Sequence, residues 1–230
     1  MRLVTDLKKW NQNRKDRRHK PAIYVFPEGF SYIPIRKCAT RSMYKLLDEQ
    51  AYRFDKQQGL LEENIGVENY KEKYREELCK GEAANFCAKQ FTFALVRDPL
   101  AKIYSAYKNK TLTTQPNSAI VNLFAKHGID RDIPFDLFIE QVCSIPDKNL
   151  DRHLRSQSWF LSENGKLLPV TIIKLENIST EWERVEEQTG LRLPNKLNST
   201  NPSPLPKLDK EHSQMFRNKY HLDYELLGYE

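Results

Sequence analysis

The stretch FTFALV, residues 91–96, constrains the fold of this chain more than any other segment. A strand with one face in water alternates apolar and polar side chains, whereas this run does not, as expected of a strand covered on both faces. Such strands belong to parallel sheets, whose connections cross over through helices. Further strand-like runs alternate with helical patterns, namely 22–26, 30–35 and 168–178. We therefore predict an α/β chain with a mostly parallel sheet.

Helices are expected between these strands, because apolar residues there recur at intervals of three and four. The first begins near Ser42, and another begins at Pro99, since the first helical position needs no N–H group. Ser179 or Thr180 is the expected cap of a later helix. The remaining segments with helical patterns are 67–81, 119–128, 134–144, 179–191 and 210–229.

The chain has 230 residues and a formal net charge of +6. This length fits one domain, which we place at residues 21–230. The preceding residues 1–20 form a basic N-terminal arm that contains KKWNQNRKDRRHK. A positive balance favours anionic ligands such as phosphates, sulfated sugars or nucleic acid, but it does not choose among them.

Four cysteines occur at irregular positions without the spacing of a zinc site, so we expect no metal. No apolar stretch approaches the length of a membrane span, and the N-terminus lacks the apolar core of a signal peptide. We expect a soluble protein of the bacterial cytoplasm, or of the Golgi lumen if a native membrane anchor has been removed. The sequence does not indicate an oligomeric state.

Two motifs follow predicted strands, where ligands of open α/β sheets collect. The first is KCATRS, residues 37–42, at the entrance to a helix. Free N–H groups and the positive end of the helix dipole favour an anion there, and Lys37, Thr40 and Ser42 add a charge and hydroxyl donors. The Walker A pattern G-x-x-x-x-G-K-[ST] is absent, and no glycine lies between Gly29 and Gly59, which disfavours an NTPase. Alone, this loop fits a basic turn equally well.

The second motif, VRDPLAKIYSAYKNK, begins at Val96. The guanidinium of Arg97 suits bidentate contact with a phosphate, and Ser105 lies about two helical turns further on. Asp98 is either a helix cap or a partner of Arg97. Taken alone, the motif fits a local ion pair on a helix surface.

Together the two motifs resemble those of the PAPS-dependent carbohydrate sulfotransferases, especially the chondroitin 4-O-sulfotransferase group. NLDRHLRSQSWFL, KLEN, LNST and YHLDYELLGY extend the resemblance over nearly the whole chain. The resemblance implies a three-layer sulfotransferase fold like that of P-loop NTPases, with helices flanking a mostly parallel central sheet. It also implies transfer of a sulfuryl group from PAPS to a carbohydrate hydroxyl, with release of PAP and without a metal.

The resemblance also implies a set of site residues. One group would bind the 5′-phosphosulfate of the donor: Lys37, Cys38, Ala39, Thr40, Arg41 and Ser42. Arg97 and Ser105 would bind its 3′-phosphate. His153 is the expected general base, with Glu28 as second choice, and Lys37 the residue that stabilises the leaving phosphate. Arg155 and Gln157 are expected to contact the acceptor.

Two other functions fit parts of the sequence. A catalytically silent PAP-binding module would have the same phosphate motifs. A basic nucleic-acid-binding protein would explain the charge and the arm, but the sequence contains no recognition helix, RNP-type strand or zinc-ligand spacing that would support it. We therefore expect a carbohydrate or another hydroxyl-bearing acceptor, and no nucleic-acid partner.

Overall fold

The computed structural model describes residues 22–61, 66–67, 74–77, 83–112, 124–193 and 204–230. The basic arm predicted for residues 1–20 lies outside them. No helix of the described residues is long and apolar enough to cross a membrane. Cys38, Cys87 and Cys143 are free thiols.

The predicted sheet is present and has the strand order β3-β1-β2-β4-β7. β2 pairs in parallel with β4, and β4 in parallel with β7, whereas β1 is antiparallel to both of its neighbours. Four of the five strands therefore run in one direction, which confirms a mostly parallel sheet. The strands are β1 Ala22–Phe26, β2 Phe30–Tyr32, β3 Arg75–Glu77, β4 Phe91–Val96 and β7 Thr171–Lys174; a separate hairpin joins β5 Ser162–Glu163 to β6 Lys166–Leu167.

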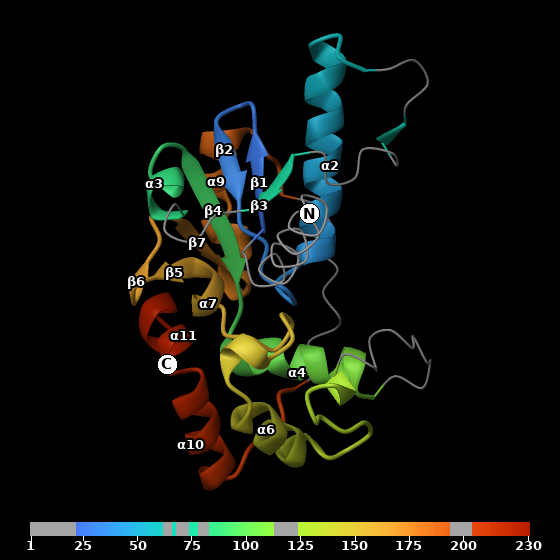
Figure 1. Cartoon of the computed structure of the whole chain (residues 1–230). Coiled ribbons are helices and arrows are strands. Elements are labelled where there is room, and N and C mark those ends of the chain that lie inside the picture. Colours follow the sequence, from blue (N-terminus) through green and yellow to red (C-terminus); the bar gives the residue numbers. More distant parts are fainter. Residues whose placement is uncertain (1–21, 62–65, 68–73, 78–82, 113–123, 194–203) are drawn as a thin grey trace, which may run out of the picture.

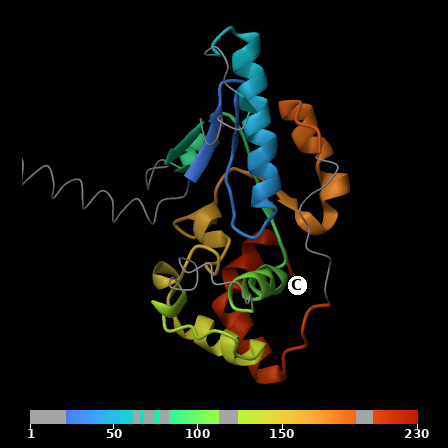
Figure 2. The ribbon, with the colours of Figure 1, turned by 90° about the vertical axis from the view of Figure 1, so that its right-hand side faces the viewer.

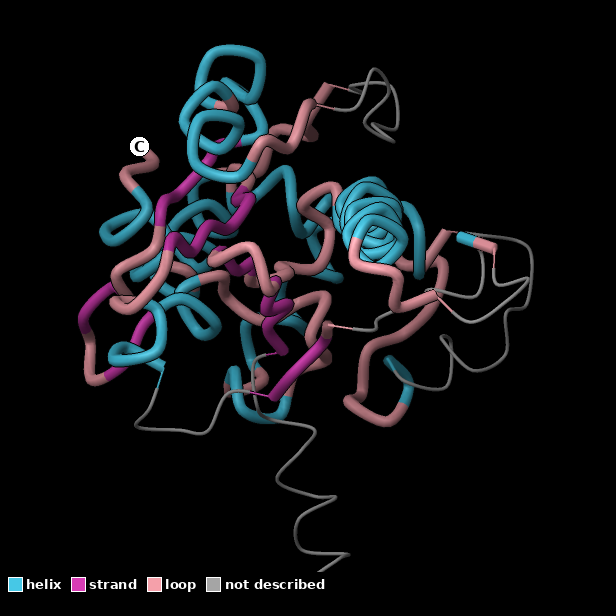
Figure 3. The backbone as a smooth tube through the Cα atoms, turned by 90° about the horizontal axis from the view of Figure 1, so that it is seen from above, coloured by secondary structure: helices cyan, strands magenta, loops and turns pink. Residues whose placement is uncertain are grey.

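Helices lie on both faces of the sheet (Figure 3). On one face, α2 (Thr40–Gln57) lies beside α9 (Glu183–Thr189), which follows α8 (Ile178–Glu181) (Figure 2). Tyr44 of α2 packs on Tyr24 with 5.2 Å between ring centroids, and Trp182 packs edge-on against Phe93 at 6.0 Å. On the other face, Cys87 of α3 (Ala83–Cys87) contacts Thr92. This arrangement confirms the expected helix–sheet–helix layers.

A second apolar cluster lies beyond the carboxyl end of β4 (Figure 1). Buried side chains of three helices meet there, including Ile103, Phe138 and Phe216. Leu150 and Leu154, which lie between the second and third of these helices in the sequence, belong to the same cluster, which therefore supports that segment. Its helices are α4 Pro99–Lys110, α6 Phe135–Ser144 and α10 Lys210–Lys219, and the chain ends with α11 His221–Leu227.

Some helix predictions were wrong in detail. Within 67–81, residues 75–77 form β3, because pairing with the edge of β1 overrides the helical preference of Glu and Arg. Half of 119–128 lies outside the described residues, and in the other half Phe124 and Ala125 are helical before the chain turns. The last helix is interrupted at Tyr220, and α8 begins at Ile178, so neither Ser179 nor Thr180 is its cap.

Candidate functional site

The loop from β2 to α2 has an unusual backbone. Lys37 and Ala39 have φ angles of 72° and 52°, in the left-handed region that residues with a side chain seldom adopt. Each such residue costs about 1 kcal/mol or more. The loop tolerates this cost without a glycine, and the result is a tight turn that delivers the chain into α2. Strain of this kind is common where a backbone is shaped to hold a ligand.

Among the residues that the structure describes, no side chain caps the N-terminus of α2. Its N-cap residue, Ala39, has no side-chain hydrogen bond to offer, and the first turn contains no acidic residue. The backbone N–H groups of Ala39, Thr40 and Arg41 have no partner among the described residues. N–H groups of this kind at the start of an 18-residue helix suit an anion.

Two predicted ligand residues in this loop have other side-chain partners. The Thr40 hydroxyl donates to the carbonyl oxygen of Ile35 at 2.9 Å, so Thr40 offers an anion its N–H group and not its hydroxyl proton. Cys38 is fully buried, and its N–H group donates to Ile35 as well. Burial raises the pKa of the Cys38 thiol to about 12, so it stays protonated. Both residues shape the loop.

The other side chains of the loop differ in exposure. Lys37 is half-buried, Arg41 is exposed, and Ser42 is buried in the first turn of α2. The guanidinium of Arg36 lies over the ring of Tyr44, 5.7 Å from its centroid. This contact holds the Arg36 side chain against α2.

At the end of β4, by contrast, carboxylates of the protein pair with N–H groups at the start of the next helix. Asp98 caps α4 by accepting a hydrogen bond from the Ala101 N–H group at 2.7 Å, and Pro99 is the first helical residue, as predicted. Glu176 accepts from the Asp98 N–H group at 2.8 Å. Carboxylates therefore occupy the N-terminus of α4, and an anion bound near this strand end depends on side chains.

Arg97 is the cation available there. Its side chain is half-buried, and within the described residues its guanidinium makes no hydrogen bond or ion pair. Ser105 lies in α4 and is 8% exposed. The structure thus leaves the guanidinium of Arg97 available for a ligand.

Gln157 joins the two strand ends. Its Oε1 accepts hydrogen bonds from the Arg97 N–H group at 2.9 Å and from the Cys38 thiol at 3.3 Å. Its Nε2 donates to the Arg97 carbonyl oxygen at 2.6 Å. Segments that are 60 and 119 residues away from Gln157 in the sequence therefore meet at one amide.

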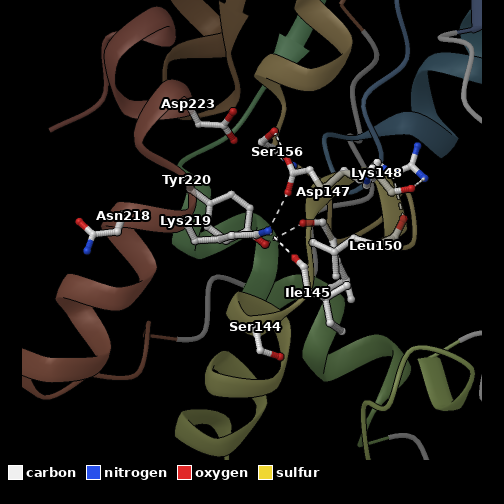
Figure 4. A network of polar contacts seen from close by, with 12 residues as sticks. Ser144, Ile145, Asp147, Lys148, Leu150, Ser156, Asn218, Lys219, Tyr220 and Asp223 are labelled. Atoms are coloured by element: carbon white, nitrogen blue, oxygen red, sulfur yellow. Dashed lines mark hydrogen bonds and ion pairs between the residues drawn. The ribbon is translucent and has the colours of Figure 1, made fainter.

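The segment that contains Gln157 is tied down along its length. Lys102 of α4, 1% exposed, donates to the carbonyl oxygens of His153 and Arg155 at 3.2 and 2.6 Å. Lys219 of α10 contacts Asp147 at 3.2 Å, and Asp147 accepts a hydrogen bond from Ser156 (Figure 4). This network includes the short 3₁₀ helix η2, Asp147–Asn149.

Arg155 belongs to this network too. Its side chain is buried, its Nε donates to the Leu150 carbonyl oxygen at 2.9 Å, and its guanidinium lies over the ring of Trp159. Arg155 and Gln157 thus bind protein atoms, and the structure gives no direct support to their predicted contact with an acceptor.

His153 is held by an aspartate two residues earlier. Asp151 Oδ1 accepts from the His153 N–H group at 2.9 Å and contacts its Nδ1 at 2.5 Å. Burial alone would raise the pKa of Asp151, but its hydrogen bonds and charge interaction with His153 outweigh burial and lower that pKa to about 2. The carboxylate therefore holds the Nδ1 proton, which leaves Nε2 as the basic nitrogen.

The second candidate base, Glu28, is in the wrong place. It lies in the turn between β1 and β2, whereas the loop that enters α2 follows β2, so the two are at opposite ends of the strand. Its carboxylate accepts a hydrogen bond from Gln50 at 2.6 Å, and burial raises its pKa. Glu28 is excluded as a base for this site.

Comparison with known proteins decides the family. A family model described as "Sulfotransferase family" matches residues 25–230, almost the whole chain. The chain belongs to the sulfotransferase family. It is therefore a transferase of a family that uses PAPS. Searches of curated proteins and of solved structures gave no match.

Sequence reasoning missed several residues that organise the site of this sulfotransferase. Asp151, two residues before His153, could have been found from the Asp-x-His spacing, which allows a carboxylate to reach Nδ1. Asp223 of α11 accepts a hydrogen bond from the Gln157 N–H group at 2.8 Å. Lys102 and Asp223 gave no such signal, because a lysine in a helix and an aspartate near the C-terminus look like surface residues. Among the described residues, no group of three or more His, Cys, Asp and Glu side chains is placed to hold a metal ion.

Proposed function

We propose that this sulfotransferase moves a sulfuryl group from PAPS to a hydroxyl group of a carbohydrate or glycoconjugate, and releases PAP. One observation carries the proposal: Gln157 hydrogen-bonds both the loop that enters α2 and the end of β4. Two anion-binding segments held together in this way suit a donor with a phosphate at each end. The carbohydrate acceptor follows from the resemblance of the 149–161 segment to carbohydrate sulfotransferases.

The residues at the two strand ends fit such a donor. The unpaired N–H groups of Ala39, Thr40 and Arg41 suit the 5′-phosphosulfate, with Lys37 and Ser42 from the same loop beside them. Arg97 would bind the 3′-phosphate, with Ser105 as a further donor from α4. The buried thiol of Cys38 would hold the loop in place by its hydrogen bond to Gln157.

In the proposed reaction the acceptor oxygen attacks sulfur, and the bond between sulfur and the 5′-phosphate oxygen breaks. The proton of the hydroxyl passes to Nε2 of His153 as the new O–S bond forms. The departing phosphate oxygen takes the electron pair of the broken bond, and Lys37 with the loop N–H groups stabilises its charge. Asp151 is a positioning residue that keeps the Nδ1 proton in place. Arg155 and Gln157 assist the acceptor indirectly, by fixing the segment that presents His153.

Transfer of radiolabelled sulfate from PAPS to a panel of acceptors tests the proposal. The panel contains glycans, a simple phenol and a small alcohol, and we expect label in glycans only. Lys37→Ala should lower turnover by about 100-fold or more, because one donor to the developing charge is lost. Lys45→Ala is the matched control, since Lys45 is an exposed lysine of α2 that pairs with Glu49.

Four results would contradict the proposal. Near-normal turnover by Lys37→Ala would remove Lys37 from the mechanism. Label in the phenol and none in any glycan would exclude a carbohydrate acceptor. Calorimetric binding of PAP without transfer to any acceptor would favour the silent binding module, and tighter binding of a short oligonucleotide than of PAP would favour a nucleic-acid-binding protein.

A further inference from the structure

The Gln157 amide holds the end of β4 and the loop that starts α2 at a fixed separation. Gln157 is fully buried, and both ends of its amide are used. Its oxygen receives the thiol of Cys38 and the N–H group of Arg97, and its nitrogen donates to the carbonyl oxygen of Arg97. The amide therefore fixes the backbone of Arg97 relative to the loop that starts α2.

The backbone of Gln157 is fixed from the opposite side. Asp223 of α11 is fully buried, and its carboxylate accepts from the N–H groups of Gln157 at 2.8 Å and Ser158 at 2.7 Å. These bonds hold the start of α7, Ser158–Leu161. Because the amide is anchored to a helix that carries no part of either phosphate site, its position does not depend on a bound ligand.

We propose that Gln157 is a positioning residue that sets the separation of the 5′- and 3′-phosphate sites, with Asp223 holding it in place. The inference rests on the proposed function, because it assumes a donor with two phosphates. A nucleoside 3′,5′-bisphosphate has a narrow range of distances between its phosphates. Two loops fixed at the matching distance bind both groups without a cost for ordering the loops.

The chemistry of the contact explains why the residue is a glutamine. Arg97 presents one N–H group and one carbonyl oxygen, and the two ends of an amide supply an acceptor for the first and a donor for the second. Gln157→Glu keeps the acceptor but turns a carboxylate oxygen toward the Arg97 carbonyl oxygen. Gln157→Met has a similar length and leaves both Arg97 groups unpaired.

The test compares PAP with adenosine 5′-monophosphate and adenosine 3′-monophosphate, each binding measured by calorimetry. We expect Gln157→Glu, which loses one buried hydrogen bond, to weaken PAP binding about tenfold, and Gln157→Met, which loses every hydrogen bond of the amide, to weaken it at least as much. The affinity for each monophosphate should change less than about twofold, because each site is intact and only their separation is altered. Gln214→Glu, on the exposed side of α10, is the control for the added charge.

Equal loss of affinity for all three nucleotides would overturn the inference, since it would indicate general damage to the site. Unchanged PAP affinity in both variants would overturn it as well. If neither variant folds, as judged by circular dichroism, Cys38→Ala provides the test, because it removes one bond to the same amide. It should weaken PAP binding about threefold with the monophosphates unchanged, and no change in PAP affinity would refute the role of Gln157. If the wild-type protein binds PAP no more tightly than it binds either adenosine monophosphate, the proposed function itself is refuted.

Discussion

Asp151→Asn is the substitution whose effect follows most directly from the structure. The pKa of Asp151 is lowered from 3.8 to about 2, although its side chain is 8% exposed and burial alone would raise it. A difference of nearly two pKa units corresponds to about 2 kcal/mol of folding free energy. For a chain of this size, that loss should lower the melting temperature by roughly 4–8 °C at neutral pH.

The pH dependence gives the expected sign. Because the pKa in the folded state lies below its value in the unfolded state, the carboxylate stabilises the protein fully above about pH 4. The contribution disappears as the pH falls toward 2, where Asp151 becomes protonated in both states. Wild type and Asp151→Asn should therefore differ by about 2 kcal/mol at pH 7 and converge as the pH falls to about 2.

Urea unfolding at several pH values measures this difference, and Glu187→Gln, an exposed acid-to-amide change in α9, is the control. Turnover provides the second measurement. With asparagine the Nδ1 proton loses its acceptor carboxylate, so we expect turnover to fall by about 10²-fold, the lower end of the effect of a general base. Equal stability of the two proteins at pH 7, or a difference that persists undiminished at low pH, would refute the reasoning. Unchanged turnover would show that His153 needs no partner.

Two further predictions concern the helices that support the site. Both ring nitrogens of His212 face carboxylates, Asp209 at 2.8 Å and Glu140 at 2.9 Å, and these hydrogen bonds raise its pKa. The stabilisation is present below the unfolded pKa of about 6.5 and is lost as the pH rises through the folded pKa, so His212→Gln should lower the urea midpoint near pH 5.5 and change it little near pH 8.5. An equal loss at both pH values would contradict this. Lys102→Met should destabilise the protein by about 3 kcal/mol in urea, because two carbonyl oxygens lose their donor and Asp223 loses a nearby positive charge. A loss no larger than that of the exposed control Lys126→Met would contradict it.

The sheet was predictable because its signal is local. The uninterrupted apolar run at 91–96 and the β1–β2 turn specify their strands within a few residues, and the structure has both. β3 was not predictable, since its charged sequence forms a strand only through pairing with β1. Tertiary pairing of this kind leaves no periodic trace in the sequence.

The candidate site was predictable as two motifs but not as an assembled structure. Sequence placed KCATRS and Arg97 at strand ends, and the family match supports the function that these motifs suggested. The sequence prediction gave Gln157 a contact with the acceptor, whereas in the structure its amide is hydrogen-bonded to Cys38 and Arg97. Such contacts join residues that are far apart along the chain, and a single sequence carries no information on which distant residues meet.

The contrast between the two helix N-termini has a consequence for how substitutions would act on donor binding. Among the described residues, the N–H groups at the start of α2 are unpaired, whereas those at the start of α4 face the carboxylates of Asp98 and Glu176. In the proposed complex, backbone N–H groups would therefore bind the phosphosulfate, and the side chains of Arg97 and Ser105 would bind the 3′-phosphate. Truncation of Arg97 would then weaken one end of the donor site, whereas no side-chain truncation removes the N–H donors at the other end.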